Sequence, residues 1–88
     1  MTQESSFPMK PEFLKYLQGF VTQTLIHLGE IDNPLGGGRT VNLELAKYSI
    51  DLIEMLKEKT AGNLTEEESS FLNGALYDLR MKYVARSR

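Results

Sequence analysis

The chain has 88 residues, no cysteine and a formal net charge of −2. A chain of this length forms one domain, and the absence of cysteine excludes disulfide bonds and thiolate metal sites. The nearly balanced charge excludes a strong general attraction to nucleic acid or to anionic membranes.

We expect residues 1–9 to form a polar tail ahead of a single domain at residues 10–86. The tail lacks the basic start and the long apolar core of a secretion signal. The most apolar stretch, residues 13–28, is interrupted by polar side chains, whereas a membrane-spanning helix needs about 20 predominantly apolar residues. We therefore expect no membrane-spanning segment.

A first helix is predicted over residues 11–28. Pro11 suits the first helical position because its missing N–H would have no partner there. Gly29 can adopt the left-handed conformation that ends a helix. A loop follows at residues 30–40, where a proline and the glycine run Gly36–Gly38 interrupt regular structure. The loop connects two helices, since neither side is large enough to fold alone.

Two further helices are predicted over residues 42–60 and 65–85. Asn42 is a favourable N-cap for the second helix, while Thr65 and Glu68 have the spacing of a capping box at the start of the third. Because only a tight turn separates these two helices, we expect them to pack as an antiparallel hairpin. The sequence thus predicts an all-α domain of three helices.

The apolar faces of these predicted helices are wider than one neighbour covers. At about 100° per residue, the apolar arc of the second helix spans roughly 240°, against about 100° for an ordinary surface helix. Gly19 and Gly74 each cost about 1 kcal/mol relative to alanine inside a helix, which favours close approach of another helix there. Ten apolar side chains are expected in cores within or between subunits: Leu17, Val21, Leu25, Leu45, Leu52, Ile53, Leu56, Leu72, Leu76 and Leu79.

This excess of apolar surface favours assembly into a homo-oligomeric helical bundle, or binding of another protein. The alternative is that Leu35 in the loop and Phe7 and Met9 in the tail cover the excess within one chain. The candidate interface residues are Gly19, Ile26, Tyr48, Met55, Gly74, Tyr77, Met81 and Val84.

Short strings along the chain resemble one known family. They are HLGE at residues 27–30, VNLELAK at 41–47, IDL at 50–52, EKT at 58–60, GNLT at 62–65, EE at 67–68 and LYDLR at 76–80. Together they resemble the bacterial domain-of-unknown-function family 1844, over roughly residues 13–84. The resemblance implies a small, helical, cytoplasmic protein and transfers no catalytic residue. The triple glycine departs from the family pattern.

No residue cluster predicts catalysis, a cofactor or a metal site. The run Gly36–Gly38 lacks the spacing and the lysine of a phosphate-binding loop, although its amides and Arg39 could hold an anion. His27 with Glu30 and Asp32 could ligate a metal, but its place at the rim of the apolar arc favours a structural histidine. A hydrolase triad needs a base oriented by a third group, and no such arrangement is indicated.

The acidic face of the second helix is expected to be solvated. A ferritin-like metal site requires Glu-x-x-His pairs on neighbouring helices, and the chain contains none. We expect Glu44–Lys47 and Glu54–Lys57 ion pairs on this face instead. The carboxylates considered are Glu44, Asp51, Glu54 and Glu58.

The basic residues near the chain end leave a second function open. Together with Arg39, they could contact nucleic-acid phosphates. Pairing of Arg80 and Lys82 with acids, including Asp78 with Lys82, and the preference of helix ends for basic residues are the favoured explanation. The basic residues are Arg80, Lys82, Arg86 and Arg88. We therefore expect a non-enzymatic assembly or protein-interaction module, with a nucleic-acid-associated protein or a small-ligand binder at a subunit interface as alternatives.

Overall fold

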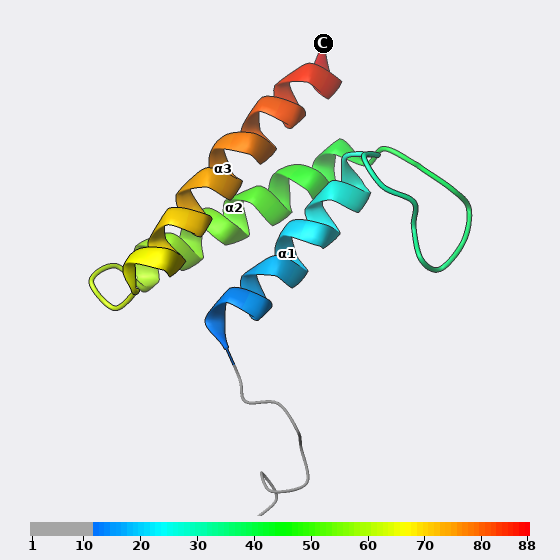
Figure 1. Cartoon of the computed structure of the whole chain (residues 1–88). Helices are drawn as coiled ribbons and strands as arrows, with labels where there is room; N and C mark the ends of the chain where they lie inside the picture. The colour runs from blue at the N-terminus through cyan, green and yellow to red at the C-terminus, as the bar shows by residue number, and fades with distance from the viewer. Residues whose placement is uncertain (1–11) are drawn as a thin grey trace, which may run out of the picture.

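The computed structural model describes residues 12–88, so the predicted tail, residue 10 and Pro11 lie outside the described residues. The part of the chain described here is all α, with α1 at Phe13–His27, α2 at Leu43–Lys59 and α3 at Glu66–Ser87, and it contains no strand (Figure 1). The predicted three-helix fold is confirmed, and each helix ends within two residues of its predicted boundary. None of the three helices combines the length and apolarity needed to cross a bilayer.

Side-chain caps fix where α2 and α3 begin. The Leu45 amide donates to Asn42 Oδ1 at 3.1 Å. At α3, the Glu68 amide donates to Thr65 Oγ1 at 3.1 Å, and the Thr65 amide donates to Glu68 Oε1 at 2.9 Å. The predicted N-cap and capping box are therefore both confirmed. The first helix differs, because Glu12 precedes it without a side-chain cap.

The end of α1 is held against the start of α2. Gly29 ends α1 with φ 77°, and a Cβ at this position would lie 2.7 Å from Val41 Cγ2. The Asn42 amide also donates to the His27 carbonyl at 2.7 Å. Only glycine combines left-handed backbone angles with so close a contact. The two ends of the segment 30–41 therefore lie next to each other.

The loop between α1 and α2 extends away from the helices (Figure 1). Gly36, Gly37 and Gly38 all have positive φ, at 106°, 90° and 70°, as the predicted use of glycine requires. A turn inside the loop is closed by a hydrogen bond from the main-chain N–H of Asn33 to the Gly38 carbonyl, at 3.0 Å. Leu35 is 94% exposed, so it covers no apolar surface. That part of the single-chain alternative is wrong, while Phe7 and Met9 lie outside the described residues.

A core of eight apolar residues joins the three helices: Leu17, Leu28, Ala46, Ile50, Ile53, Leu72, Leu76 and Leu79. Five of the predicted core positions are in this set, and Val21, Leu25, Leu52 and Leu56 are half-buried. Leu45 is 45% exposed and lies outside the core of the single chain. The reason is its position about 100° around α2 from the buried Ala46. The buried Thr24 hydroxyl donates to the Phe20 carbonyl at 2.8 Å.

Candidate assembly surface

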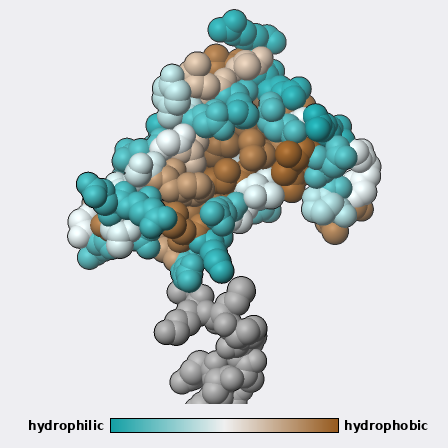
Figure 2. Space-filling view, in the orientation of Figure 1, coloured by the Kyte–Doolittle hydropathy of each residue, from teal (hydrophilic) through white to brown (hydrophobic). Residues whose placement is uncertain are grey.

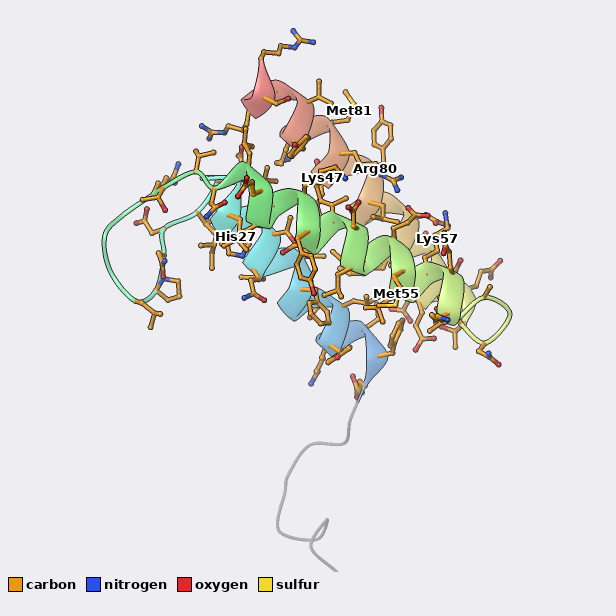
Figure 3. The ribbon with its side chains drawn as sticks, turned by 180° about the vertical axis from the view of Figure 1, so that it is seen from behind. His27, Lys47, Met55, Lys57, Arg80 and Met81 are labelled. Carbon is orange, nitrogen blue, oxygen red and sulfur yellow. The ribbon has the colours of Figure 1, made fainter. Side chains whose placement is uncertain are left out.

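One apolar stripe lies on the outer side of α3, opposite the core. Tyr77, Met81 and Val84 are 70%, 55% and 48% exposed, and Ser70 and Gly74 continue the stripe toward the start of the helix. Figure 3 shows Met81 pointing away from α1 and α2. Intervals of four and three positions place these five residues on one face. We call Ser70, Gly74, Tyr77, Met81 and Val84 the outer α3 stripe.

A second apolar stripe follows α2. Leu45, Tyr48 and Met55 are 45%, 65% and 38% exposed, and the half-buried Leu52 lies between them. Met55 is visible on the outer side of α2 in Figure 3. These four residues, which we call the outer α2 stripe, are separated by three, four and three positions, the interval at which helices pair. Thus α2 and α3 each present apolar side chains on two sides.

Apolar surface is also visible on the opposite side of the molecule. Figure 2 shows a brown area crossing the middle of the domain between α1 and α3. Single exposed apolar residues are ordinary on protein surfaces, whereas aligned ones indicate an interaction site. The exposed large apolar side chains among residues 12–88 are Tyr16, Leu35, Val41, Leu45, Tyr48, Met55, Tyr77, Met81 and Val84.

The two helical glycines face open space in the described part of the chain. A Cβ built at Gly19 or Gly74 would have no heavy atom within 4 Å. The close helix approach that the sequence predicts at these positions is therefore not made by α1, α2 or α3 on one another. Both glycines are exposed, as are the other predicted interface residues except Ile26, which is half-buried. Ser70 was not among the predicted interface residues, although it lies four positions before Gly74 on the same face of α3.

Most of the basic residues considered for phosphate binding form ion pairs. Arg80 pairs with Glu54 across α2 and α3, and Arg39 pairs with Asp32 in the loop at 3.3 Å. The predicted Asp78–Lys82 pair is confirmed at 2.8 Å. Carboxylates thus compensate four basic side chains, counting Arg86, and Arg88 is exposed at the end of α3.

Arg86 ties the end of α3 to the end of α1. Its Nε lies 3.3 Å from Glu30 Oε2, and its Nη2 donates to the Gly29 carbonyl at 3.2 Å. A guanidinium is suited to such a double contact because its donors are rigidly arranged. Arg86 therefore has a structural role, which its sequence position near the chain end did not reveal.

The acidic face of α2 pairs differently from the prediction. Lys47 bonds Asp51 at 2.8 Å instead of Glu44, and Glu54 pairs with Arg80 instead of Lys57. The reason is that four-residue spacing brings Lys47 and Asp51 together, while packing of α3 brings Arg80 to α2. The hydrogen bond from Lys47 to Asp51 and the carboxylate charge raise the pKa of Lys47. A hydrogen bond to Asp78 raises the pKa of Lys82.

The residues considered for a metal site do not come together. In residues 12–88, no group of three histidine, aspartate or glutamate side chains is placed to hold a metal ion. His27 is half-buried, and its carbonyl accepts from the Asn42 amide at 2.7 Å. Glu30 and Asp32 instead pair with Arg86 and Arg39.

Comparison with known proteins gives one match. The model of the family described as Domain of unknown function (DUF1844) matches residues 10–85. This match confirms the family resemblance and includes α1, α2 and nearly all of α3. No curated protein and no solved structure matches the chain.

Proposed function

We propose that this chain, which belongs to the DUF1844 family of domains of unknown function, is a non-enzymatic assembly module that forms a homo-oligomeric helical bundle. The observation that carries the proposal is the outer α3 stripe, in which Tyr77, Met81 and Val84 remain 70%, 55% and 48% exposed. A helix that is apolar on two sides needs a neighbour on each. Within the described residues, α3 has neighbours on its inner side alone.

The size of the domain also supports assembly. An 88-residue chain buries only about 60% to 70% of the surface that its unfolded form exposes. Small domains without disulfides or metals commonly gain stability by oligomerising. Covering the outer stripes would add apolar burial that the single chain lacks, at about 25 cal/mol per Å².

We propose that α2 and α3 form an antiparallel hairpin that moves as one unit. Its support is the short connection at residues 60–65 and the ion pair between Arg80 and Glu54. Tyr83 near the end of α3 also lines the same surface hollow as Lys47 near the start of α2. A rigid hairpin would present its two outer stripes in fixed directions, which favours specific assembly.

We prefer assembly to the two alternatives for physical reasons. Association with nucleic acid relies on uncompensated positive charge, and the ion pairs described above compensate most of the basic candidates. A small-ligand site at a subunit interface presupposes that subunits associate. We place the module in the bacterial cytoplasm, which the family resemblance implies and the cysteine-free composition supports.

Light scattering coupled to gel filtration tests the proposal on the full chain at micromolar concentrations. We expect a mass of at least two chains, decreasing toward one chain on dilution. A mass of one chain at every concentration would contradict the proposal. A parallel titration of labelled RNA and DNA at low and moderate salt distinguishes the nucleic-acid alternative, since phosphate contacts weaken steeply as salt rises.

A further inference from the structure

We infer that the outer α3 stripe binds the same stripe of a second copy, with the two α3 helices antiparallel. This inference rests on the proposed function and specifies its contact. The stripe runs from Ser70 to Val84 along one side of α3, a length of about 20 Å at 1.5 Å per residue. It lies opposite Leu72, Leu76 and Leu79, which are almost fully buried against α1 and α2.

The stripe is accessible along its whole length. All five of its residues are exposed, and Tyr77 is the most exposed tyrosine, at 70%, among residues 12–88. Met81 projects outward from α3 in Figure 3, while Arg80 beside it pairs with Glu54 of α2. A second helix could therefore lie along the stripe without displacing the core or this ion pair.

The sizes of the side chains favour antiparallel over parallel pairing. The amino-terminal half of the stripe has the small residues Ser70 and Gly74, and the carboxy-terminal half has Tyr77, Met81 and Val84. Antiparallel pairing places the large half of each helix against the small half of its partner. Parallel pairing would place large against large and leave a gap at Gly74. The open space above Gly74 is what a large side chain from an antiparallel partner would occupy.

The charges at the two ends of α3 favour the same direction. Glu66 and Glu67 are exposed in the first turn, and Arg88 is exposed at the other end. In an antiparallel pair, each acidic first turn faces the basic end of the partner, and the helix dipoles oppose. Asp78 and Lys82, in the middle of α3, already neutralise each other. A parallel pair would bring like charges together at both ends.

The outer α2 stripe is less suited to pairing with itself. Glu44, Asp51 and Glu58 follow one edge of this stripe at seven-residue intervals. In an antiparallel homotypic pair, an edge meets the same edge of the partner, so these carboxylates would face one another, and Lys47 compensates only Asp51 among them. Like charges at such positions destabilise helix pairs. Charge complementarity therefore selects α3 as the contact between copies.

Engineered cysteines test the contact in this cysteine-free chain. Tyr77 lies near the middle of the stripe, so the Cα atoms of two paired copies fall within disulfide reach, below about 7 Å. We expect Tyr77→Cys, oxidised at micromolar concentration, to shift to the mass of two covalently joined chains. The matched control is Tyr48→Cys, which replaces a tyrosine of similar exposure, 65% against 70%, on α2. We expect it to stay a single chain. Circular dichroism checks that both variants remain helical.

Direction is tested by mixing two single variants. When Ser70→Cys is mixed with Val84→Cys and oxidised, antiparallel pairing predicts mainly the mixed disulfide, identified by mass spectrometry of the joined peptides. Excess of the two homotypic disulfides would overturn the antiparallel direction.

The outcomes separate this inference from the proposed function. If the unmodified chain has the mass of one chain, the assembly proposal fails and this contact fails with it. If the unmodified chain is oligomeric but Tyr77→Cys does not cross-link, the α3 contact is overturned while assembly stands. Cross-linking at both Tyr77→Cys and Tyr48→Cys would show that oxidation does not distinguish the two faces, and it would overturn the selection of α3 as the contact between copies.

Discussion

The inner and outer faces of α3 follow the same spacing but have different surroundings. Leu72 and Leu76 on the inner face are each 1% exposed, whereas Tyr77 and Met81 on the outer face are 70% and 55% exposed. Both faces repeat at intervals of three and four residues, so both have the pattern of a packed helix surface. Periodicity therefore indicates how many sides of a helix need a neighbour, but not which chain supplies that neighbour.

The largest expected effect is on the inner face. Leu76→Ala would leave a cavity among core side chains, and we expect it to lower the free energy of unfolding by about 3 kcal/mol. Met81→Ala, on the outer face, should change the stability of the dissociated chain by less than about 0.5 kcal/mol. Urea unfolding at concentrations where the chain is a monomer measures both. If both variants lose the same free energy of unfolding, the two faces of α3 do not differ in their packing within the single chain.

A second comparison uses two glycines in different surroundings. Gly29→Ala would place a Cβ 2.7 Å from Val41 Cγ2 at φ 77°, so we expect a loss of about 2 kcal/mol from strain and steric overlap. Gly38 also has positive φ, at 70°, but a Cβ there meets nothing within 4 Å. Gly38→Ala should therefore cost about half as much, from backbone strain alone. Thermal unfolding compares the two variants, and identical shifts would rule out the close contact at Gly29.

Replacing the helical glycines should raise the free energy of unfolding, in contrast to the substitutions above. Gly19→Ala and Gly74→Ala should each stabilise the dissociated chain by about 1 kcal/mol, because alanine is the better helix former and space is open at both positions. In addition, Gly74→Ala should weaken self-association, since its methyl group enters the space assigned to a partner side chain. Gly19→Ala is the control for association. An unchanged dissociation constant for Gly74→Ala would argue against a close α3 contact.

The smallest expected effect concerns surface ion pairs away from both apolar faces. Asp51 raises the pKa of Lys47, and Asp78 raises that of Lys82, above the usual 10.5. Such a lysine adds stability at pH values below 10.5, and this stability is lost as the pH rises through the raised folded-state pKa. We expect Tm to fall as the pH rises through this range, and the fall should be slight because both ion pairs lie at the surface. The double variant Lys47→Gln/Lys82→Gln should lose less Tm than the unmodified chain over this range. If the double variant and the unmodified chain lose the same Tm over this pH range, these ion pairs are not the cause of the fall.

The sequence predicts most of the fold because its local signals are strong. Asn42 and the Thr65–Glu68 pair marked two helix starts, and Gly29 marked one end, since each acts on backbone groups a few residues away. Leu45 was expected in a core within or between subunits and lies outside the core of the single chain, because an apolar arc of roughly 240° does not show which part of it faces inward.

Long-range contacts were the part that local patterns did not reveal. The Arg80–Glu54 and Arg86–Glu30 pairs join residues 26 and 56 positions apart, and they form only once α3 packs on α2 and α1. Four residues of the outer α3 stripe, Gly74, Tyr77, Met81 and Val84, were predicted as interface residues from the excess of apolar surface. What covers them depends on a second molecule, which no pattern within one chain specifies.

Sedimentation equilibrium of the unmodified chain beside Tyr77→Glu tests most directly whether the outer face of α3 is an interface. We expect a mass of at least two chains for the unmodified protein. For the variant we expect a dissociation constant about 30-fold higher, equivalent to about 2 kcal/mol for a central interface residue, with helical content unchanged. A single-chain mass for the unmodified protein, or equal dissociation constants for the two proteins, would contradict an interface on this face.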